Sequence, residues 1–304
     1  MIRLVFFGTP EFSIPSLEYL RDRISLVITR PDRPQGRGLK VLSTPVKSKA
    51  IELRIPVLSP ERLIDIKDKL TGFDLGVVVA YGLIIPRKII NLFPMGIINL
   101  HPSLLPKYRG AAPIQWALLN GEEETGVSII YLTEELDAGD IIIQEKVKIL
   151  PEDNAETLSS RLSVIGANVL AKAVELIENN NVRPVPQNSL GIPSYAPKIE
   201  PQMGRIDWNT GARDIVNKVR ALSLWPGAYF YSKGIKVNML EAEVSPINGE
   251  AGKVIDIGDN GILVGSRDGS VWIKKIRPEN RKIMSGLDFA NGYRIKIGDP
   301  ISDG

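Results

Sequence analysis

The N-terminal part of the chain alternates short apolar runs with amphipathic segments. Apolar or alternating runs predict buried strands at residues 2–8, 24–29, 74–81, 96–100, 127–132 and 141–149. Apolar residues at helical spacing predict helices at residues 11–23, 45–53, 60–70, 86–92, 112–120 and 155–179. This order is typical of an α/β fold, so we expect a mostly parallel, Rossmann-like sheet with helices on both faces.

The C-terminal part follows a different pattern. One predicted helix at 212–222 precedes short β-rich runs separated by Gly and Asn, at residues 228–231, 236–243, 252–257, 261–265 and 270–276. Short strands at this spacing predict a small all-β barrel, similar to an OB fold. Five prolines between Pro184 and Pro201 predict an extended, semi-rigid connection. We therefore expect an α/β domain at 1–182, a proline-rich linker at 183–204 and a β domain at 205–304.

Composition narrows the possible classes of protein. A chain of 304 residues predicts about two domains, and 43% hydrophobic with 24% charged residues is typical of soluble globular proteins. The absence of Cys excludes disulfides, thiolate nucleophiles and Cys-ligated zinc, and a single His excludes a His-rich metal site. No apolar run approaches the ~18 residues of a membrane span, and the start is too short for a signal peptide, so we expect a cytoplasmic protein.

The net charge of the chain is only +3, but basic residues are concentrated in one segment. The segment from Arg30 to Arg54 carries seven basic and two acidic residues, and its Pro and Gly residues predict a mobile loop at 31–38. Such a basic loop suits a polyanionic partner, although a solvated surface loop would explain the same charges.

Candidate chemistry lies where the predicted strands end, because ligands of parallel sheets bind at the carboxyl ends of the strands. Asn99 and His101 are two residues apart, so a strand would place both side chains on one face. The alternative to a functional site is that Asn99 caps a turn and His101 is an ordinary packed histidine. Asp137 lies in the predicted turn Leu136–Asp140, where Asp is ordinarily structural, and it joins the site only if the fold brings it to His101.

The first predicted strand ends in Gly8-Thr9-Pro10. This is not the Gly-x-Gly-x-x-Gly fingerprint of dinucleotide binding, because Pro10 occupies the position of the middle glycine. A nicotinamide-dependent dehydrogenase is therefore disfavoured.

A series of ordered motifs resembles a known enzyme family. The motifs include Phe7–Phe12, Arg30–Gly38, Pro45–Lys47, Val79–Leu83, Asn99–His101, Ser103–Pro106, Arg109–Gln115, Glu124–Val127, Leu136–Asp140 and Arg205–Trp208. Over nearly its whole length the sequence resembles the methionyl-tRNA formyltransferase family, and its N-terminal half resembles the wider group of folate-dependent formyltransferases. The resemblance implies transfer of the formyl group of 10-formyltetrahydrofolate to the α-amino group of methionyl initiator tRNA, for translation initiation.

The resemblance also implies roles for individual residues. It implies that Asn99, His101 and Asp137 are catalytic. It implies a folate site formed by Ser103, Leu104, Leu105, Pro106, Tyr81 and Gly82, and a tRNA-binding set of Arg37, Gly38, Leu39, Lys40 and Lys47, with the domain at 205–304 as a second tRNA-binding surface. Pro102 departs from the family, which more often has Gly there, and it removes a backbone donor. We expect no metal, no membrane association and a monomeric bacterial enzyme.

We expect direct acyl transfer, because the chain offers no recognisable covalent nucleophile. The Asn99 carboxamide and a protonated His101 would stabilise the oxyanion, and Asp137 would favour the imidazolium and, directly or through a water, collect the amine proton. Three alternatives remain open at this point: a formyltransferase for a small amine, a formyltetrahydrofolate hydrolase, and a tRNA-binding module with a vestigial site.

Overall fold

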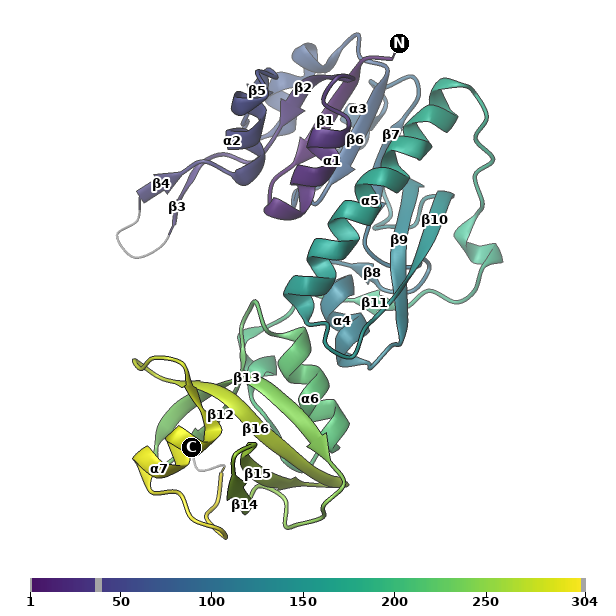
Figure 1. Cartoon of the computed structure of the whole chain (residues 1–304). Helices are drawn as coiled ribbons and strands as arrows, with labels where there is room; N and C mark the ends of the chain where they lie inside the picture. Colours follow the sequence, from purple (N-terminus) through teal and green to yellow (C-terminus); the bar gives the residue numbers. More distant parts are fainter. Residues whose placement is uncertain (1, 36–39, 302–304) are drawn as a thin grey trace. The chain divides into compact units, whose positions relative to one another are not determined.

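The computed structural model of the chain describes residues 2–35 and 40–301 (Figure 1). Contacts divide it into two compact units. Unit 1 comprises residues 1–113, 124–148 and 159–196, and unit 2 comprises residues 114–123, 149–158 and 197–304. Among the described residues, no helix is both long and apolar enough to cross a membrane.

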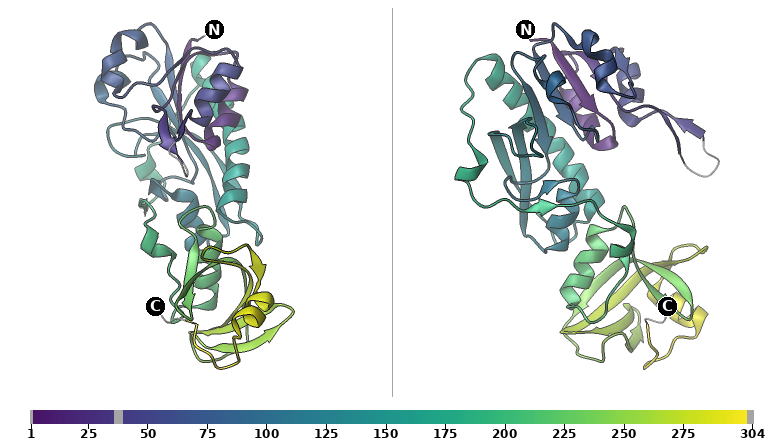
Figure 2. Two further views of the ribbon diagram at one scale, coloured as in Figure 1. Left: turned by 90° about the vertical axis from the view of Figure 1, so that its left-hand side faces the viewer. Right: turned by 180° about the vertical axis from the view of Figure 1, so that it is seen from behind.

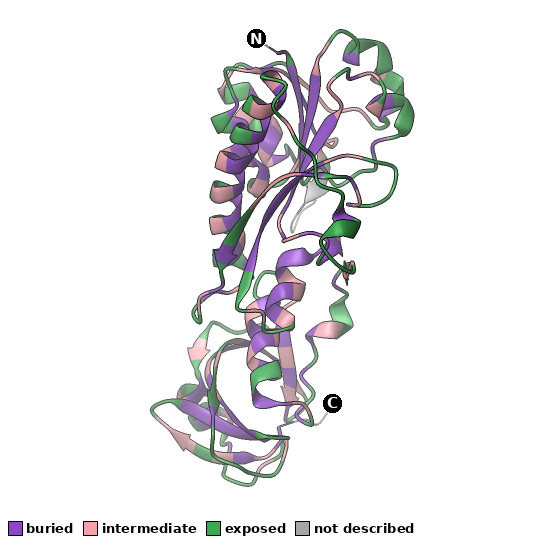
Figure 3. Cartoon of the chain, turned by 90° about the vertical axis from the view of Figure 1, so that its right-hand side faces the viewer, coloured by how far each residue is buried: buried purple, intermediate pink, exposed green. Residues whose placement is uncertain are grey.

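Unit 1 is built on a seven-stranded sheet in the order β10-β9-β7-β6-β1-β2-β5. Its strands are β1 (Leu4–Gly8), β2 (Ile24–Ile28), β5 (Val57–Leu58), β6 (Leu75–Val79), β7 (Ile97–His101), β9 (Glu124–Tyr131) and β10 (Ile141–Lys148). The pairs from β5 to β7 are parallel, and β9 and β10 add antiparallel strands at one edge. Every residue of β1, β6 and β7 is buried (Figure 3), as a sheet covered on both faces requires. The expected mostly parallel α/β sheet is confirmed.

Helices cover both faces of this sheet. The 3-10 helix η2 (Leu63–Leu70) and α3 (Arg87–Ile90) bury Leu63, Leu70 and Ile89 against side chains of β1, β2 and β7. The opposite face carries η1 (Glu11–Ser13), α1 (Ile14–Tyr19), α2 (Pro45–Glu52) and the long helix α5 (Ala155–Glu178) (Figures 1 and 2). Two predicted helices are thus shorter or tighter than expected: residues 11–23 give only η1 and α1, and residues 60–70 give a 3-10 helix.

The basic segment is more regular than the expected loop. β3 (Arg33–Gln35) and β4 (Lys40–Leu42) pair antiparallel on the two sides of residues 36–39. An ion pair of 2.6 Å between Lys47 Nζ and Asp32 Oδ2 ties the start of this hairpin to α2. Thr44 caps α2, because its hydroxyl accepts from the Lys47 backbone N–H.

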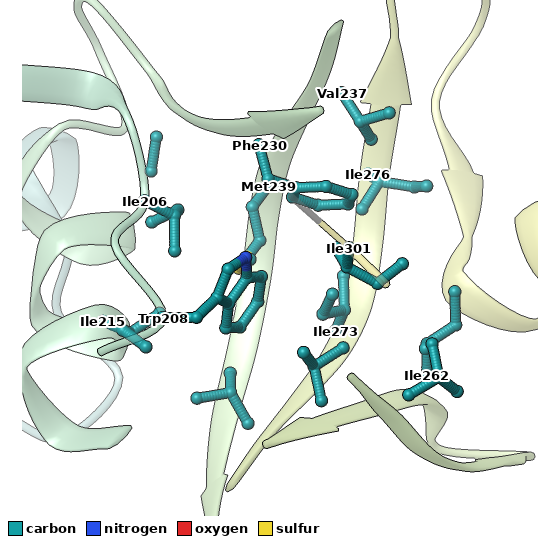
Figure 4. Close-up of a cluster of buried hydrophobic side chains, with 14 of the residues drawn as sticks. Ile206, Trp208, Ile215, Phe230, Val237, Met239, Ile262, Ile273, Ile276 and Ile301 are labelled. Carbon is teal, nitrogen blue, oxygen red and sulfur yellow. The ribbon is translucent and has the colours of Figure 1, made fainter. Parts of the chain in front are cut away.

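Unit 2 contains an antiparallel sheet in the order β12-β13-β16-β15-β14, with β17 paired to β16. Its elements are α4 (Pro113–Leu119), η4 (Pro201–Gly204), α6 (Ala212–Ala221), β12 (Ala228–Ser232), β13 (Ile235–Ser245), β14 (Val254–Gly258), β15 (Gly261–Ser266), β16 (Gly269–Pro278), β17 (Met284–Ser285) and α7 (Gly286–Tyr293). Figure 4 shows the core, in which the Trp208 and Phe230 rings meet edge to face. The expected small β domain is confirmed as an antiparallel sheet, while α7 was not predicted.

Gly126 in β9 allows a close approach that a side chain would prevent. A Cβ there would clash with the backbone oxygen of Glu145 and lie 2.5 Å from Leu104 Cδ2.

We therefore expect Gly126→Ala to lower the free energy of unfolding by about 1–3 kcal/mol, as overpacking does. The matched control is Gly292→Ala in α7, where a Cβ meets nothing within 4 Å in the described part of the chain. That variant should gain about 0.4–1 kcal/mol in denaturant titrations. Equal effects of the two substitutions would contradict the packing assigned to Gly126.

Candidate active site

Asn99 and His101 lie at the carboxyl end of β7, where the parallel strands meet the antiparallel ones. Being two residues apart on a strand, they project from the same face, and both are buried. Leu100 between them projects from the other face, toward Gly166 of α5. β7 is paired on both sides, which fixes the backbone of both polar residues.

Asp137 reaches this pair from the turn that connects β9 to β10. Its backbone is left-handed, with φ of 50°, a conformation that Asp tolerates better than most residues. The Gly110 N–H donates to Asp137 Oδ2 at 2.9 Å, and Asn99 Nδ2 lies 3.5 Å from Oδ1. His101 Nδ1 is 3.6 Å from Asp137 Oδ2. A carboxamide, an imidazole and a carboxylate therefore converge from segments 36 or more positions apart in the sequence.

The second ring nitrogen of His101 is already engaged. Nε2 lies 2.9 Å from the Tyr108 carbonyl oxygen, and a carbonyl oxygen only accepts, so Nε2 carries a proton and donates it there. Tyr108 also has a left-handed backbone, with φ of 64°, within the turn that follows β7. Only Nδ1 of His101 is left to face Asp137 and a substrate.

Burial lowers the pKa of His101 below its ordinary value of 6.5. The Asp137 charge and the hydrogen bond to Tyr108 both raise this pKa, but removal of the imidazole from water is the larger effect. Near neutral pH the imidazole is therefore neutral, with its proton on Nε2 and a lone pair on Nδ1. This differs from our expectation of a protonated His101, because the sequence did not reveal how completely the ring would be buried.

Family models and curated relatives match the chain over most of its length. Residues 3–174 match the Formyl transferase family model, and residues 198–294 match the model for the formyl transferase C-terminal domain. The chain is 42% identical over 302 residues to methionyl-tRNA formyltransferase of Thermodesulfovibrio yellowstonii, with 97% of each chain covered. It is 40% identical over 303 residues to the enzyme of the same name from Thermus thermophilus, with 98% of each covered.

The chain belongs to the methionyl-tRNA formyltransferase family. Solved structures of lower identity share its fold. An N-formyltransferase from Helicobacter canadensis, in complex with folinic acid and dTDP-3-aminofucose, aligns with a TM-score of 0.68 at 21% identity and covers 89% of this chain and 98% of that one. HypX from Aquifex aeolicus, in complex with tetrahydrofolic acid, aligns with a TM-score of 0.64 at 20% identity. That alignment covers 98% of this formyltransferase but only 48% of HypX.

The segment expected to line the folate site of this formyltransferase is held by hydrogen bonds within its own loop and to Ser128 of β9. The Ser128 hydroxyl donates to the Ser103 carbonyl at 2.6 Å and accepts from the Leu105 N–H at 3.1 Å. Ser103 Oγ donates to the Lys107 carbonyl, and Leu105 packs with Ile130 and Ile141. Ser103, Leu105 and Pro106 are buried, and Leu104 is half-buried.

Pro102 fits its place in spite of the missing N–H. The Ser103 N–H donates to the His101 carbonyl at 3.0 Å, which closes a turn around residue 102. A turn of this kind needs no donor from its central residue, and the fixed φ of proline suits it.

Tyr81 and Gly82 follow β6. The Tyr81 ring is buried in the hydrophobic cluster and meets the Phe7 ring edge to face, and burial raises the pKa of its hydroxyl to about 12. The Tyr81 hydroxyl has no hydrogen-bond partner among the described residues. Gly82 has a φ of 79° that favours glycine. The Tyr81 side chain is thus a core residue, and its place in the folate site stays a prediction.

The expected tRNA-binding residues are only partly described. Arg37, Gly38 and Leu39 lie outside the described residues, and of Lys40 only the backbone, in β4, is described. Lys47 forms an ion pair with Asp32, so its positive charge is already balanced by a carboxylate of the protein.

Sequence reasoning missed Tyr108, Gly110 and Gln187. Tyr108 and Gly110 act through backbone atoms, which residue types do not reveal. Gln187 lies in the segment interpreted as a linker, and nothing in its sequence neighbourhood pointed to its contacts with the Asp137 turn.

Because His101 is the only histidine in the chain, its titration is directly measurable. We expect the NMR signal of its Cε1 proton, in protein without a histidine tag, to titrate with a midpoint below 6.5. Asp137→Asn should lower the midpoint further, since the Asp137 charge raises the pKa. The control is the same protein unfolded in urea, which should titrate near the ordinary value. A native midpoint at or above that of the unfolded chain would contradict the assignment.

Proposed function

We propose that this formyltransferase moves the formyl group of 10-formyltetrahydrofolate to the α-amino group of methionyl initiator tRNA by direct attack. The observation that carries the proposal is the convergence of Asn99, His101 and Asp137 around one buried point. The names of relatives at about 40% identity over the whole chain support the tRNA substrate. The folate ligands of the Helicobacter canadensis and Aquifex aeolicus structures support the donor.

Asn99 is the group we assign to the oxyanion. Its amide nitrogen carries two hydrogens, and one faces Asp137 Oδ1, which leaves the other for the formyl oxygen. The amide is neutral, and strand β7 holds it in place, so it requires no reorganisation as negative charge develops.

His101 is the group we assign to proton transfer. In the neutral ring, the Nδ1 lone pair accepts the proton that the amine loses on attacking the formyl carbon. The imidazolium then forms beside the Asp137 carboxylate, whose negative charge stabilises it. From Nδ1 the proton passes to the departing nitrogen of the folate, which restores the neutral ring.

A covalent formyl-enzyme is disfavoured by the surroundings of the nearby hydroxyls. The chain has no Cys. The hydroxyls of Ser103 and Ser128 donate to the carbonyls of Lys107 and Ser103 within the protein, and neither donates to His101. Without a base to activate them, these hydroxyls are poor nucleophiles.

Asn99→Ala tests the oxyanion role. We expect kcat to fall about 10²–10³-fold, the usual cost of losing one oxyanion donor. Binding of the folate, measured by calorimetry, should change little. Asn168→Ala on α5 is the matched control, because within the described residues that amide makes one hydrogen bond, to the Val164 carbonyl. Wild-type turnover in Asn99→Ala would refute the role.

For the tRNA we propose a second surface, on the outer face of the unit 2 sheet. Tyr229 of β12, Asn238 of β13 and Arg277 of β16 form one cross-strand row, and Tyr231 pairs with Lys236 in the next. Lys236 Nζ lies 3.8 Å from the centroid of the Tyr229 ring. In the described part of the chain, neither Lys236 nor Arg277 forms an ion pair with a carboxylate. Cations interleaved with aromatic rings suit phosphates and exposed bases.

Replacing Lys236 and Arg277 together with Ala tests this surface. We expect the KM for methionyl-tRNA to rise several-fold and its salt dependence to weaken, because phosphate contacts release counterions. The KM for the folate should stay unchanged. Lys253→Ala is the matched control, since Lys253 is paired with Glu250 at 2.7 Å. A parallel rise of both KM values would contradict the assignment.

Arg37 and Lys40 stay predicted tRNA contacts, and the same assay applies to them.

A further inference from the structure

Gln187 is a buried side chain inside the segment that the sequence presents as a linker. It lies in the short 3-10 helix η3 (Gln187–Ser189), and only 3% of it is exposed. Its Nε2 donates to the backbone carbonyls of Asp137 at 2.7 Å and of Gly139 at 2.8 Å. Both amide hydrogens therefore hold the turn that carries the Asp137 carboxylate.

The other end of the Gln187 amide is also fixed. Its Oε1 accepts from Arg109 Nε at 3.0 Å and from Arg109 Nη2 at 2.9 Å, while Arg109 Nη1 pairs with Glu135 Oε1. Since carbonyls only accept and a guanidinium only donates, this network permits one orientation of the amide. Gln187 thus connects the Asp137 turn to Arg109, the residue between Tyr108 and Gly110.

The far end of the same segment holds the second loop of the site. Ser194 Oγ accepts from the Tyr108 N–H at 2.9 Å, and the Ser194 carbonyl accepts from the Arg109 N–H at 2.9 Å. β11 (Tyr195–Ala196) pairs with β8 (Arg109–Gly110). At its near end, Val185 exchanges two backbone hydrogen bonds with Ile141. The segment therefore contacts the loop of Tyr108 and the turn of Asp137.

We propose that Gln187 is a positioning residue of the catalytic site and that it sets the distance between Asp137 and His101. Ser194 positions the Tyr108 carbonyl, and through it the His101 ring. This inference rests on the formyl-transfer function proposed above. Its physical reason is geometric: Asp137 acts on His101 across 3.6 Å, and a misplacement of about 1 Å can cost up to about 10²-fold in rate.

A purely structural role is the alternative, since buried polar networks also stabilise folds. The two differ in what Gln187→Met does. This change keeps the length of the side chain and removes both donors. A structural role predicts lower stability with unchanged chemistry, whereas a positioning role predicts that kcat and the His101 titration change.

The experiment compares wild type, Gln187→Met and Ser194→Ala with the control Asn188→Ala, whose side chain is exposed. We expect Gln187→Met to lower kcat about 10- to 100-fold while the KM values for folate and methionyl-tRNA stay within about threefold. Its His101 midpoint should fall below that of wild type, because Asp137 moves away. Ser194→Ala should lower kcat in the same way, and Asn188→Ala should match wild type.

The outcomes separate the two proposals. Wild-type protein without formyl transfer would refute the proposed function, and the NMR midpoint of Gln187→Met would still test the positioning role. Wild-type kcat and an unmoved midpoint in Gln187→Met would overturn that role, even if the variant is less stable. If Gln187→Met does not fold, Ser194→Ala decides: lower kcat at unchanged KM supports the proposal, and wild-type kcat overturns it.

Discussion

The structure of the site depends on one buried carboxylate. One oxygen of Asp137 accepts from the Gly110 N–H, and the other oxygen faces the NH₂ group of the Asn99 amide. A charge withdrawn from water is tolerable only when such groups surround it. These two oxygens therefore fix the relative positions of three segments: the loop at 108–110, the end of β7 and the β9–β10 turn. Each oxygen needs a donor, and the donors come from the first two of these segments.

The two ring nitrogens of His101 have different neighbours, and we therefore propose different roles for them. The Tyr108 carbonyl accepts a hydrogen bond from Nε2–H, which keeps the proton on that nitrogen, and burial favours the neutral ring near neutral pH. In the proposed reaction the ring accepts a proton from the attacking amine and then gives it to the departing nitrogen of the folate, while Asn99 is the neutral donor. Because an α-amino group titrates near ~7.7–8.0, only modest base strength is needed, and a weakly basic, well-oriented imidazole suffices.

The sequence predicted the fold well and the site in part. Apolar runs identified the strands of the parallel sheet, because burial on both faces leaves a continuous hydrophobic signal. The sequence prediction was wrong or incomplete where tertiary packing determines the local structure, as in the 3-10 helix at Leu63–Leu70 and in α7. Spacing placed Asn99 and His101 on one face, but the approach of Asp137 and the contacts of Gln187 are long-range, and the ionisation of His101 depends on a burial that no local pattern encodes.

The tautomer of the single histidine tests most directly the different roles proposed for its two ring nitrogens. In protein labelled with ¹⁵N-histidine, two-bond and three-bond proton–nitrogen correlations distinguish a protonated ring nitrogen from a bare one. We expect a neutral ring with the proton on Nε2 and a bare Nδ1 above neutral pH. A ring with its proton on Nδ1, or one protonated on both nitrogens at that pH, would contradict these roles.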